Sequence, residues 1–218
     1  MELITFIILC IVGVVTILLE SRSILKWIYL PIAFLFMVVM RLNCFVFNGF
    51  EIDIVTYASE MKSFSYDLYY VREFVFWYSL RIIYFITQSS VITCLIVDLF
   101  WIYILMKISS MLGSKKLGNG LVVILLTSFP FFFGYENIYR QFLANVVLLY
   151  SYSLLSNSPR KAMWLLVVSF FIHNTVLLML PLFIVKRFFG FNLNARVVFA
   201  SALSVIYVLT LDVLSQLK

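Results

Sequence analysis

Arg140 and His173 are the residues of this chain best suited to chemistry, because each lies in a long apolar segment where lipid should exclude charge. His173 is the only histidine. A charged side chain at the centre of a bilayer costs roughly 2.5 to 3.5 kcal/mol, so it needs a partner or a function. We therefore hypothesise that the two segments, joined by a short basic turn, line a membrane-embedded site for an anionic ligand.

The first of these segments also carries a row of amides. If it is one helix, three amide side chains recur every four residues and must face protein or water: Asn137, Gln141 and Asn145. Glu136 stands four residues before Arg140 and is the local partner available to it. Arg140 is therefore either a planar, permanently charged group that grips phosphate or carboxylate, or an interfacial anchor paired with Glu136.

Three other ionisable residues have two readings each. His173 is a proton carrier or a donor to phosphate, or else a neutral imidazole hydrogen-bonded inside a helix bundle. Arg81 is a ligand-binding cation or a side chain whose head reaches water along its own stem. Asp98, inside an apolar run, is a buried carboxylate with a chemical role, or it pairs with a neighbouring span and has none.

A polar stretch rich in tyrosine and carboxylates separates the second apolar run from the third. Its candidate residues are Asp53, Tyr57, Asp67 and Glu73. Acidic and aromatic side chains together suit sugar binding, through hydrogen bonds to hydroxyls and stacking on pyranose faces. A solvated surface loop has the same composition, and the sequence leaves both readings open.

Composition requires these residues to be positioned by membrane helices. Hydrophobic residues make up 64% of the chain and charged residues 12%, and the mean hydropathy is +1.09. The apolar runs are continuous rather than alternating, which predicts an all-α, polytopic membrane protein with about six to eight membrane segments. Basic residues flank the runs, so the net charge of +6 reports topology rather than binding to nucleic acid.

The apolar runs divide a single integral membrane domain, residues 1–218, into segments. We expect a loop over 41–73 on the outer face and an amphipathic interfacial helix over 74–88, which leaves the following lysines inside as the positive-inside rule prefers. The expected spans are 3–19, 27–40, 91–106, 117–133, 138–155 and 197–214, the first remaining as an anchor.

The segment 162–185 is unusual, because a single crossing would leave Lys186, Arg187 and Arg196 outside. One resolution is a broken helix near His173, with two halves that dip in and return; such backbone is tolerated at membrane depth only where it lines a polar cavity. The other is a simple span whose flanking cations bind an anion outside.

No motif of a soluble enzyme is present, and the three cysteines show no spacing typical of disulfides or metal sites. We therefore expect no cofactor and no metal.

Two stretches, ENIYRQFLANVVLLYSYSLL and RKAMWLLVVSFFIHNTVLLMLPLFI, resemble the EpsG-like and O-antigen polymerase families of bacterial inner membranes. Their R-Q-x-x-A helix matches Arg140, Gln141 and Ala144, and their phenylalanine-histidine segment matches the region of His173, here with Ile172 inserted. The upstream pattern of these families corresponds to Arg41, Gly49, Asp53 and Tyr57, and a glutamate opening the next helix to Glu73. The resemblance covers about residues 35 to 185.

The resemblance implies a polymerase that joins undecaprenyl-diphosphate-linked oligosaccharide units on the periplasmic face, without a metal. Arg140 and Arg81 would cradle the diphosphate, His173 would donate to phosphate, and Asp53 or Glu73 would be the base or contact the acceptor. The implied substrate-binding set also includes Tyr57, Gln141, Asn145 and Glu136. Its implied partners are the lipid-linked oligosaccharide, the bilayer, a chain-length regulator and a flippase.

Two departures from the family pattern concern activity. The chain ends one span after the histidine segment, where relatives continue, and Asp53-Ile54 stands where relatives often have an aspartate-threonine pair. The competing classes are a flippase or transporter subunit for lipid-linked glycans, an inactive truncated relative, a membrane-bound acyltransferase built on His173, and a scaffold protein.

Overall fold

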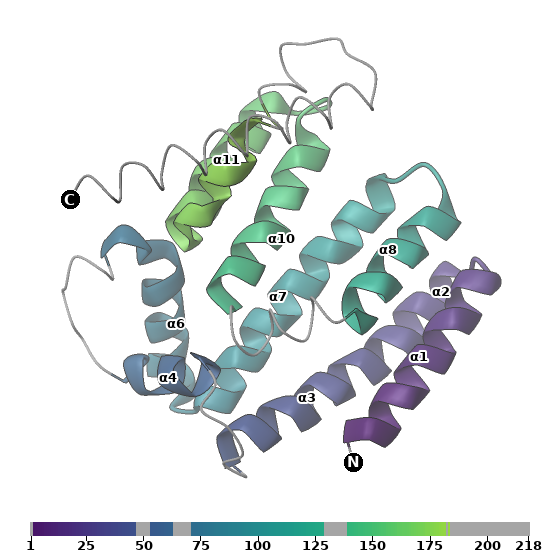
Figure 1. Cartoon of the computed structure of the whole chain (residues 1–218), viewed down its shortest axis with the longest axis horizontal. Coiled ribbons are helices and arrows are strands. Elements are labelled where there is room, and N and C mark those ends of the chain that lie inside the picture. Colours follow the sequence, from purple (N-terminus) through teal and green to yellow (C-terminus); the bar gives the residue numbers. More distant parts are fainter. Residues whose placement is uncertain (1, 47–52, 63–70, 129–138, 182, 184–218) are drawn as a thin grey trace, which may run out of the picture.

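A computed structural model describes residues 2–46, 53–62, 71–128, 139–181 and 183. Helix accounts for 89% of these residues, and no strand occurs among them, so the expected all-α class is confirmed for this part of the chain. Figure 1 shows long helices lying side by side.

The N-terminal part is a helical hairpin. α1 (Glu2–Leu18) ends in a turn at Glu20, whose φ is 49°, and α2 (Arg22–Ile24), the π-helical turn η1 (Leu25–Tyr29) and α3 (Leu30–Val46) then follow without a break. Ser21 caps α2 by accepting a hydrogen bond from the Ile24 amide. The chain needs this sharp turn because α1 packs back against α3.

The remaining described elements are six helices and one 3₁₀ segment. A short helix, α4 (Asp53–Glu60), precedes α6 (Phe74–Thr87), and Gln88 at φ 51° closes a tight turn into α7 (Ser90–Met111). They are followed by α8 (Lys115–Thr127), α10 (Tyr139–Leu154), α11 (Pro159–Ile172) and η2 (Asn174–Met179).

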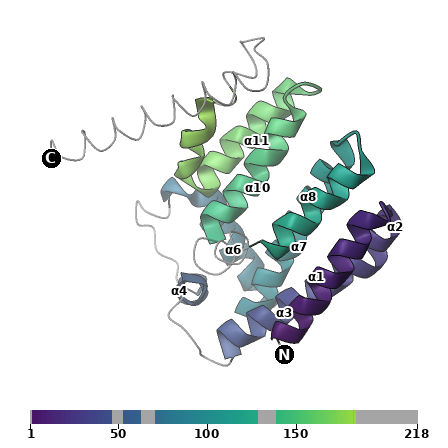
Figure 2. The same ribbon diagram turned by 45° about the vertical axis from the view of Figure 1, so that its right-hand side comes forward.

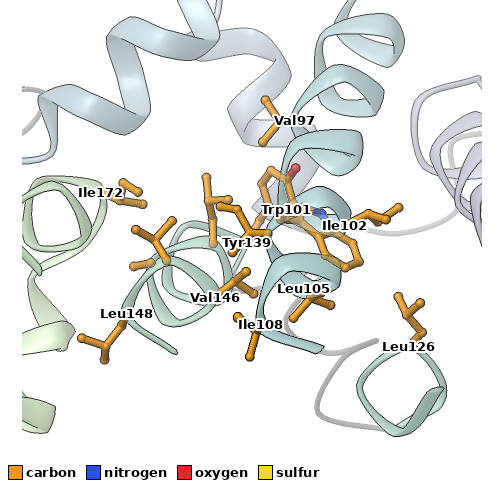
Figure 3. Close-up of a cluster of buried hydrophobic side chains, with 14 of the residues drawn as sticks. Val97, Trp101, Ile102, Leu105, Ile108, Leu126, Tyr139, Val146, Leu148 and Ile172 are labelled. Atoms are coloured by element: carbon orange, nitrogen blue, oxygen red, sulfur yellow. The ribbon is translucent and has the colours of Figure 1, made fainter. Parts of the chain in front are cut away.

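α7 is the central helix of the described bundle. It packs against α3, α6, α8 and α10, with α1 and α3 on one side and α10 and α11 on the other (Figures 1 and 2). Figure 3 shows Trp101, Leu105 and Ile108 of α7 beside Val146 of α10. The core therefore lies between helices rather than under a sheet.

The outer surface of the described helices is apolar. Leu3 on α1 is 70% exposed, and Phe85 and Ile86 on α6 are 71% and 75% exposed. Two described helices, Arg22–Phe45 and Ser90–Met111, are long and apolar enough to cross a membrane, and α1 and α6 are shorter apolar helices. The full set of six to eight spans stays a prediction, and the expected span 197–214 lies outside the described residues.

A buried ion pair ties α3 to α7. Arg41 donates from Nε to Asp98 Oδ2 at 2.9 Å and from Nη2 to Oδ1 at 3.0 Å, and both side chains are fully buried. Asp98 also accepts from Trp101 Nε1 at 3.0 Å and from the Tyr139 hydroxyl at 2.8 Å. The cation that the buried Asp98 carboxylate requires is therefore Arg41, on a neighbouring helix.

This pair corrects the expected start of the outer loop. A loop beginning at Arg41 is wrong, because α3 continues to Val46 and residues 53–60 form α4. Arg41 does not end the helix because its charge is neutralised inside the bundle. Arg81, 3% exposed on the inner face of α6, is likewise buried rather than directed to water. The interfacial position of α6 stays a prediction, although its outward face is apolar.

Removing one charge of the buried pair should be strongly destabilising. We expect Asp98→Asn to lower the free energy of unfolding by roughly 3 to 5 kcal/mol, because Arg41 is left buried without its counter-charge. Thermal unfolding of the purified protein in detergent measures this loss.

The double variant Arg41→Met/Asp98→Leu is the matched comparison, since it removes both charges and should recover most of the loss. An Asp98→Asn protein as stable as the parent would contradict this role of the pair.

Candidate functional site

Three of the residues expected to act together meet in the structure. Glu73 at the start of α6 accepts a hydrogen bond from Arg140 Nη1 through one carboxylate oxygen and contacts His173 Nδ1 through the other. The three residues are separated by 67 and 100 positions in the chain. We call Glu73, Arg140 and His173 the polar cluster.

Two members of the cluster, Arg140 and His173, are positioned by local features of the chain. Arg140 follows Tyr139, whose hydroxyl is fixed on Asp98, so the buried ion pair places the first turn of α10. His173 follows the end of α11 in an extended conformation, with φ −160° and ψ 131°, and η2 begins directly after it. The predicted helix break near His173 is thus confirmed; the proposed return of the chain depends on residues outside the described set.

Arg140 contacts two aromatic rings that also touch each other, Tyr57 and Trp77. Its guanidinium carbon is 5.3 Å from the centroid of Tyr57 and 5.4 Å from that of Trp77, and Nε donates to the Tyr57 hydroxyl at 3.2 Å. Cation–π contacts of this kind hold the charge in one place while leaving it positive. The Arg140 side chain keeps 16% of its surface exposed, so a ligand can reach it.

Trp77 is a residue that sequence reasoning missed. It stands four residues after Glu73 and four before Arg81, so the three share one face of α6, and all are at most 4% exposed. That spacing is a signal the sequence contained: a glutamate, a tryptophan and an arginine in one row of an otherwise apolar helix. Tyr139 was missed as well, since its role depends on Asp98.

The cluster keeps Glu73 ionised. Burial acts to raise the pKa of this carboxyl, but the hydrogen bond with His173 and the positive charge of Arg140 outweigh it and hold the pKa below its usual 4.5. An ionised carboxylate only accepts, so His173 donates from Nδ1. The other ring nitrogen, Nε2, is left as the site's proton acceptor or donor, on a side chain that is 18% exposed.

An apolar cavity of about 490 Å³ lies between α6, α7, α10 and α11. Its lining includes Val75, Leu143 and Ile172, which are two residues after Glu73, three after Arg140 and one before His173. Glu73, Arg140 and His173 are not among its lining residues, which are mostly apolar and aromatic side chains of these four helices.

The remaining predicted site residues are not joined to the cluster by a described contact. Asp53 is exposed at the start of α4, one turn before Tyr57. Arg81 lies two turns along α6 from Glu73, about 12 Å away. Gln141 is half-buried, and Asn145 is exposed in a separate hollow beside Tyr152 and Phe183. Glu136 and Asn137 lie outside the described residues.

Metal chemistry has no obvious ligand set here. Among the residues that the structure describes, no group of three or more His, Cys, Asp or Glu side chains is placed to hold an ion. The polar cluster itself offers one carboxylate and one imidazole, and a guanidinium cannot coordinate a metal.

Comparison with protein-family models, with curated proteins and with solved structures gives no match. The function of the polar cluster is therefore inferred from its own geometry and from the motif resemblance given above.

The charge state of Glu73 makes stability depend on pH. We expect Glu73→Gln to lower the free energy of unfolding at pH 7 by about 2 kcal/mol, since two charge-assisted hydrogen bonds are weakened. A carboxyl whose pKa is lowered by folding stabilises the folded state above its usual pKa and loses that effect in acid. The gap between parent and variant should therefore close as the pH falls below 4.5.

Melting temperatures of both proteins across this pH range measure the effect. Glu20→Gln, which changes an exposed carboxylate in the turn after α1, is the control and should follow the parent throughout. A gap between parent and Glu73→Gln that stays constant with pH would contradict the assignment.

Proposed function

We propose that the chain is a polytopic protein of the bacterial inner membrane that polymerises undecaprenyl-diphosphate-linked oligosaccharide units on the periplasmic face. The observation that carries this proposal is the meeting of Glu73, Arg140 and His173, near which in sequence lie residues that line an apolar cavity. Such a substrate has a lipid chain, an anionic diphosphate and a glycan. The apolar cavity suits the lipid chain, and Arg140 suits the diphosphate.

The membrane setting is supported by the outer surface of the bundle. Large apolar side chains are exposed on α1, α6 and α7, a surface that water would not tolerate as a continuous patch but lipid would cover. The charged residues Arg41, Asp98 and Arg81 point inward instead. This inversion of the usual pattern of soluble proteins favours a lipid environment.

The polar cluster suits glycosyl transfer. The acceptor sugar hydroxyl attacks the anomeric carbon of the growing glycan, a new carbon–oxygen bond forms, and the bond to the diphosphate breaks with its electron pair leaving on the phosphate oxygen. His173 Nε2 accepts the hydroxyl proton, while Glu73 holds the imidazole through Nδ1 and stabilises its positive charge. Arg140 stabilises the charge that develops on the leaving diphosphate.

This scheme changes the roles expected from the family resemblance. The lowered pKa of Glu73 makes its carboxylate a weak base, so it is better suited to orient His173 than to take the proton itself. Tyr57 acts through Arg140, which it holds by a hydrogen bond and a ring contact. Arg81 and Asp53 keep their proposed contacts to diphosphate and sugar as expectations from the resemblance.

Loss of the polar cluster should abolish chain growth. We expect Arg140→Ala and His173→Ala to reduce the glycan ladder to single repeat units, a loss of at least about a hundredfold in transfer for the removal of an acid–base group. The measurement is the length distribution of surface glycan in cells that lack the native polymerase and express each variant at equal levels.

Arg160→Ala, which removes a basic residue at the start of α11 away from the cluster, should leave the ladder unchanged. A stable, inserted parent that gives no ladder would refute polymerase activity of this chain alone; it would favour the flippase reading if labelled lipid-linked glycan becomes accessible in the other leaflet without growing longer.

The apolar cavity should receive the isoprenoid chain. Val168 and Val167 are neighbours on α11, 37% and 43% exposed, but only Val168 lines this cavity. We expect Val168→Trp to raise the KM for a long-chain lipid-linked substrate roughly tenfold, equivalent to about 1.4 kcal/mol of lost binding.

Val167→Trp is the matched control and should keep the parental KM. A short-chain analogue of the substrate, which leaves the cavity empty, should be used equally well by both variants. An equal rise in KM for the two substrates with Val168→Trp would place the lipid chain elsewhere.

A further inference from the structure

A second hollow, of about 860 Å³, lies between the stretch from α2 to the start of α3 and the C-terminal end of α7. Four cations line it and no carboxylate does, among the residues described: Arg22, Lys26, Lys107 and Lys115. Its walls also include Trp27, Leu30, Leu99, Ile102 and Met106. We call it the cationic hollow.

The cationic hollow is separate from the polar cluster. Lys107 is nine residues after Asp98 on α7, which corresponds to about 14 Å along the helix axis. Arg140 lies next to Tyr139, the residue that binds Asp98. A headgroup bound at Lys107 is therefore remote from the site of the proposed transfer.

One side of the hollow is fixed by a polar contact across helices. Arg22 donates to the Ser109 hydroxyl at 2.7 Å and to the Ser109 carbonyl oxygen at 2.8 Å, which joins α2 to the last turn of α7. Gly118 of α8 makes room for it, because a Cβ there would lie 2.6 Å from Arg22 Nη2. The hollow thus has a defined frame.

We propose that the cationic hollow binds an anionic phospholipid, with the headgroup phosphate among the lysines and an acyl chain along its apolar wall. Trp27 is 79% exposed and Leu99 49% exposed, so the wall is open to a chain lying against the bundle. A soluble anion would leave these side chains uncovered, whereas a lipid satisfies the charges and the apolar wall together.

The positive-inside rule alone accounts for basic residues near helix ends, but not for their arrangement here. The cations come from two stretches far apart in the sequence, around residues 22–26 and 107–115, and they meet at one hollow with apolar walls. The proposal depends on insertion in a bilayer and does not depend on glycan transfer.

The test uses the full chain in nanodiscs and quenching of tryptophan fluorescence by brominated lipid. Trp27 lines the hollow, while Trp164, 72% exposed on α11, does not. At equal mole fraction, brominated phosphatidylglycerol should quench Trp27 more strongly than brominated phosphatidylcholine. The contribution of Trp27 is the difference between the parent and Trp27→Phe, and quenching of Trp164 by both lipids reports insertion itself.

Lys26→Ala/Lys107→Ala should lower the preference for phosphatidylglycerol roughly tenfold. The charge-matched control, Lys116→Ala/Lys161→Ala, changes two basic residues that do not line the hollow and should keep the preference. Melting temperatures of both variants establish that they are folded.

Equal quenching of Trp27 by the two lipids, or an equal loss in the two double variants, would overturn the proposal and leave only a general attraction to anionic surfaces. Absence of Trp164 quenching would overturn membrane insertion, and with it both this proposal and the membrane setting of the proposed function. If the cells make a glycan ladder but the protein shows no preference for phosphatidylglycerol, only the lipid site in the hollow is refuted.

Discussion

The ion pair between Arg41 and Asp98 is the contact on which the described bundle depends most. It joins α3 to α7, and through the Tyr139 hydroxyl it reaches α10, so three segments meet at one carboxylate. A fully buried pair adds little net stability over apolar residues of the same size, but it tolerates few other arrangements of its helices. Since Arg140 is the next residue after Tyr139, a contact with no direct role in chemistry determines where the candidate site is built.

The Arg41–Asp98 ion pair and the polar cluster differ in exposure. This difference indicates which of them has a structural role and which can bind a ligand. The side chains of Arg41 and Asp98 are sealed at 0% exposed, so no ligand reaches them. Those of Arg140 and His173 are 16% and 18% exposed. In an apolar protein every buried charge needs a partner, so pairing alone identifies nothing; a paired charge that stays accessible is the informative case.

Much of the fold was predictable because apolar runs in this chain are long and are interrupted where helices end. The charge balance of flanking residues made a helix break at His173 one of two alternatives, and Glu73, Arg140 and His173 were chosen from residue type and resemblance. Their meeting was not predictable, since contacts across 67 and 100 residues leave no trace in one sequence. The loop boundary at Arg41 was wrong for the same reason: the partner that allows Arg41 to be buried, Asp98, lies on another helix.

The positions of the polar cluster and the cationic hollow in the bundle bear on how a substrate would reach the site. With the hollow in the cytoplasmic leaflet, Asp98 lies about 14 Å deeper, close to the middle of a hydrocarbon core of about 30 Å. Arg140 lies in the first turn of α10, the end that the expected inward crossing places toward the outer face, and it contacts Tyr57 and Glu73 of the expected outer loop. Under the proposed function, the lipid chain of the substrate would stay in the apolar cavity while its diphosphate meets Arg140.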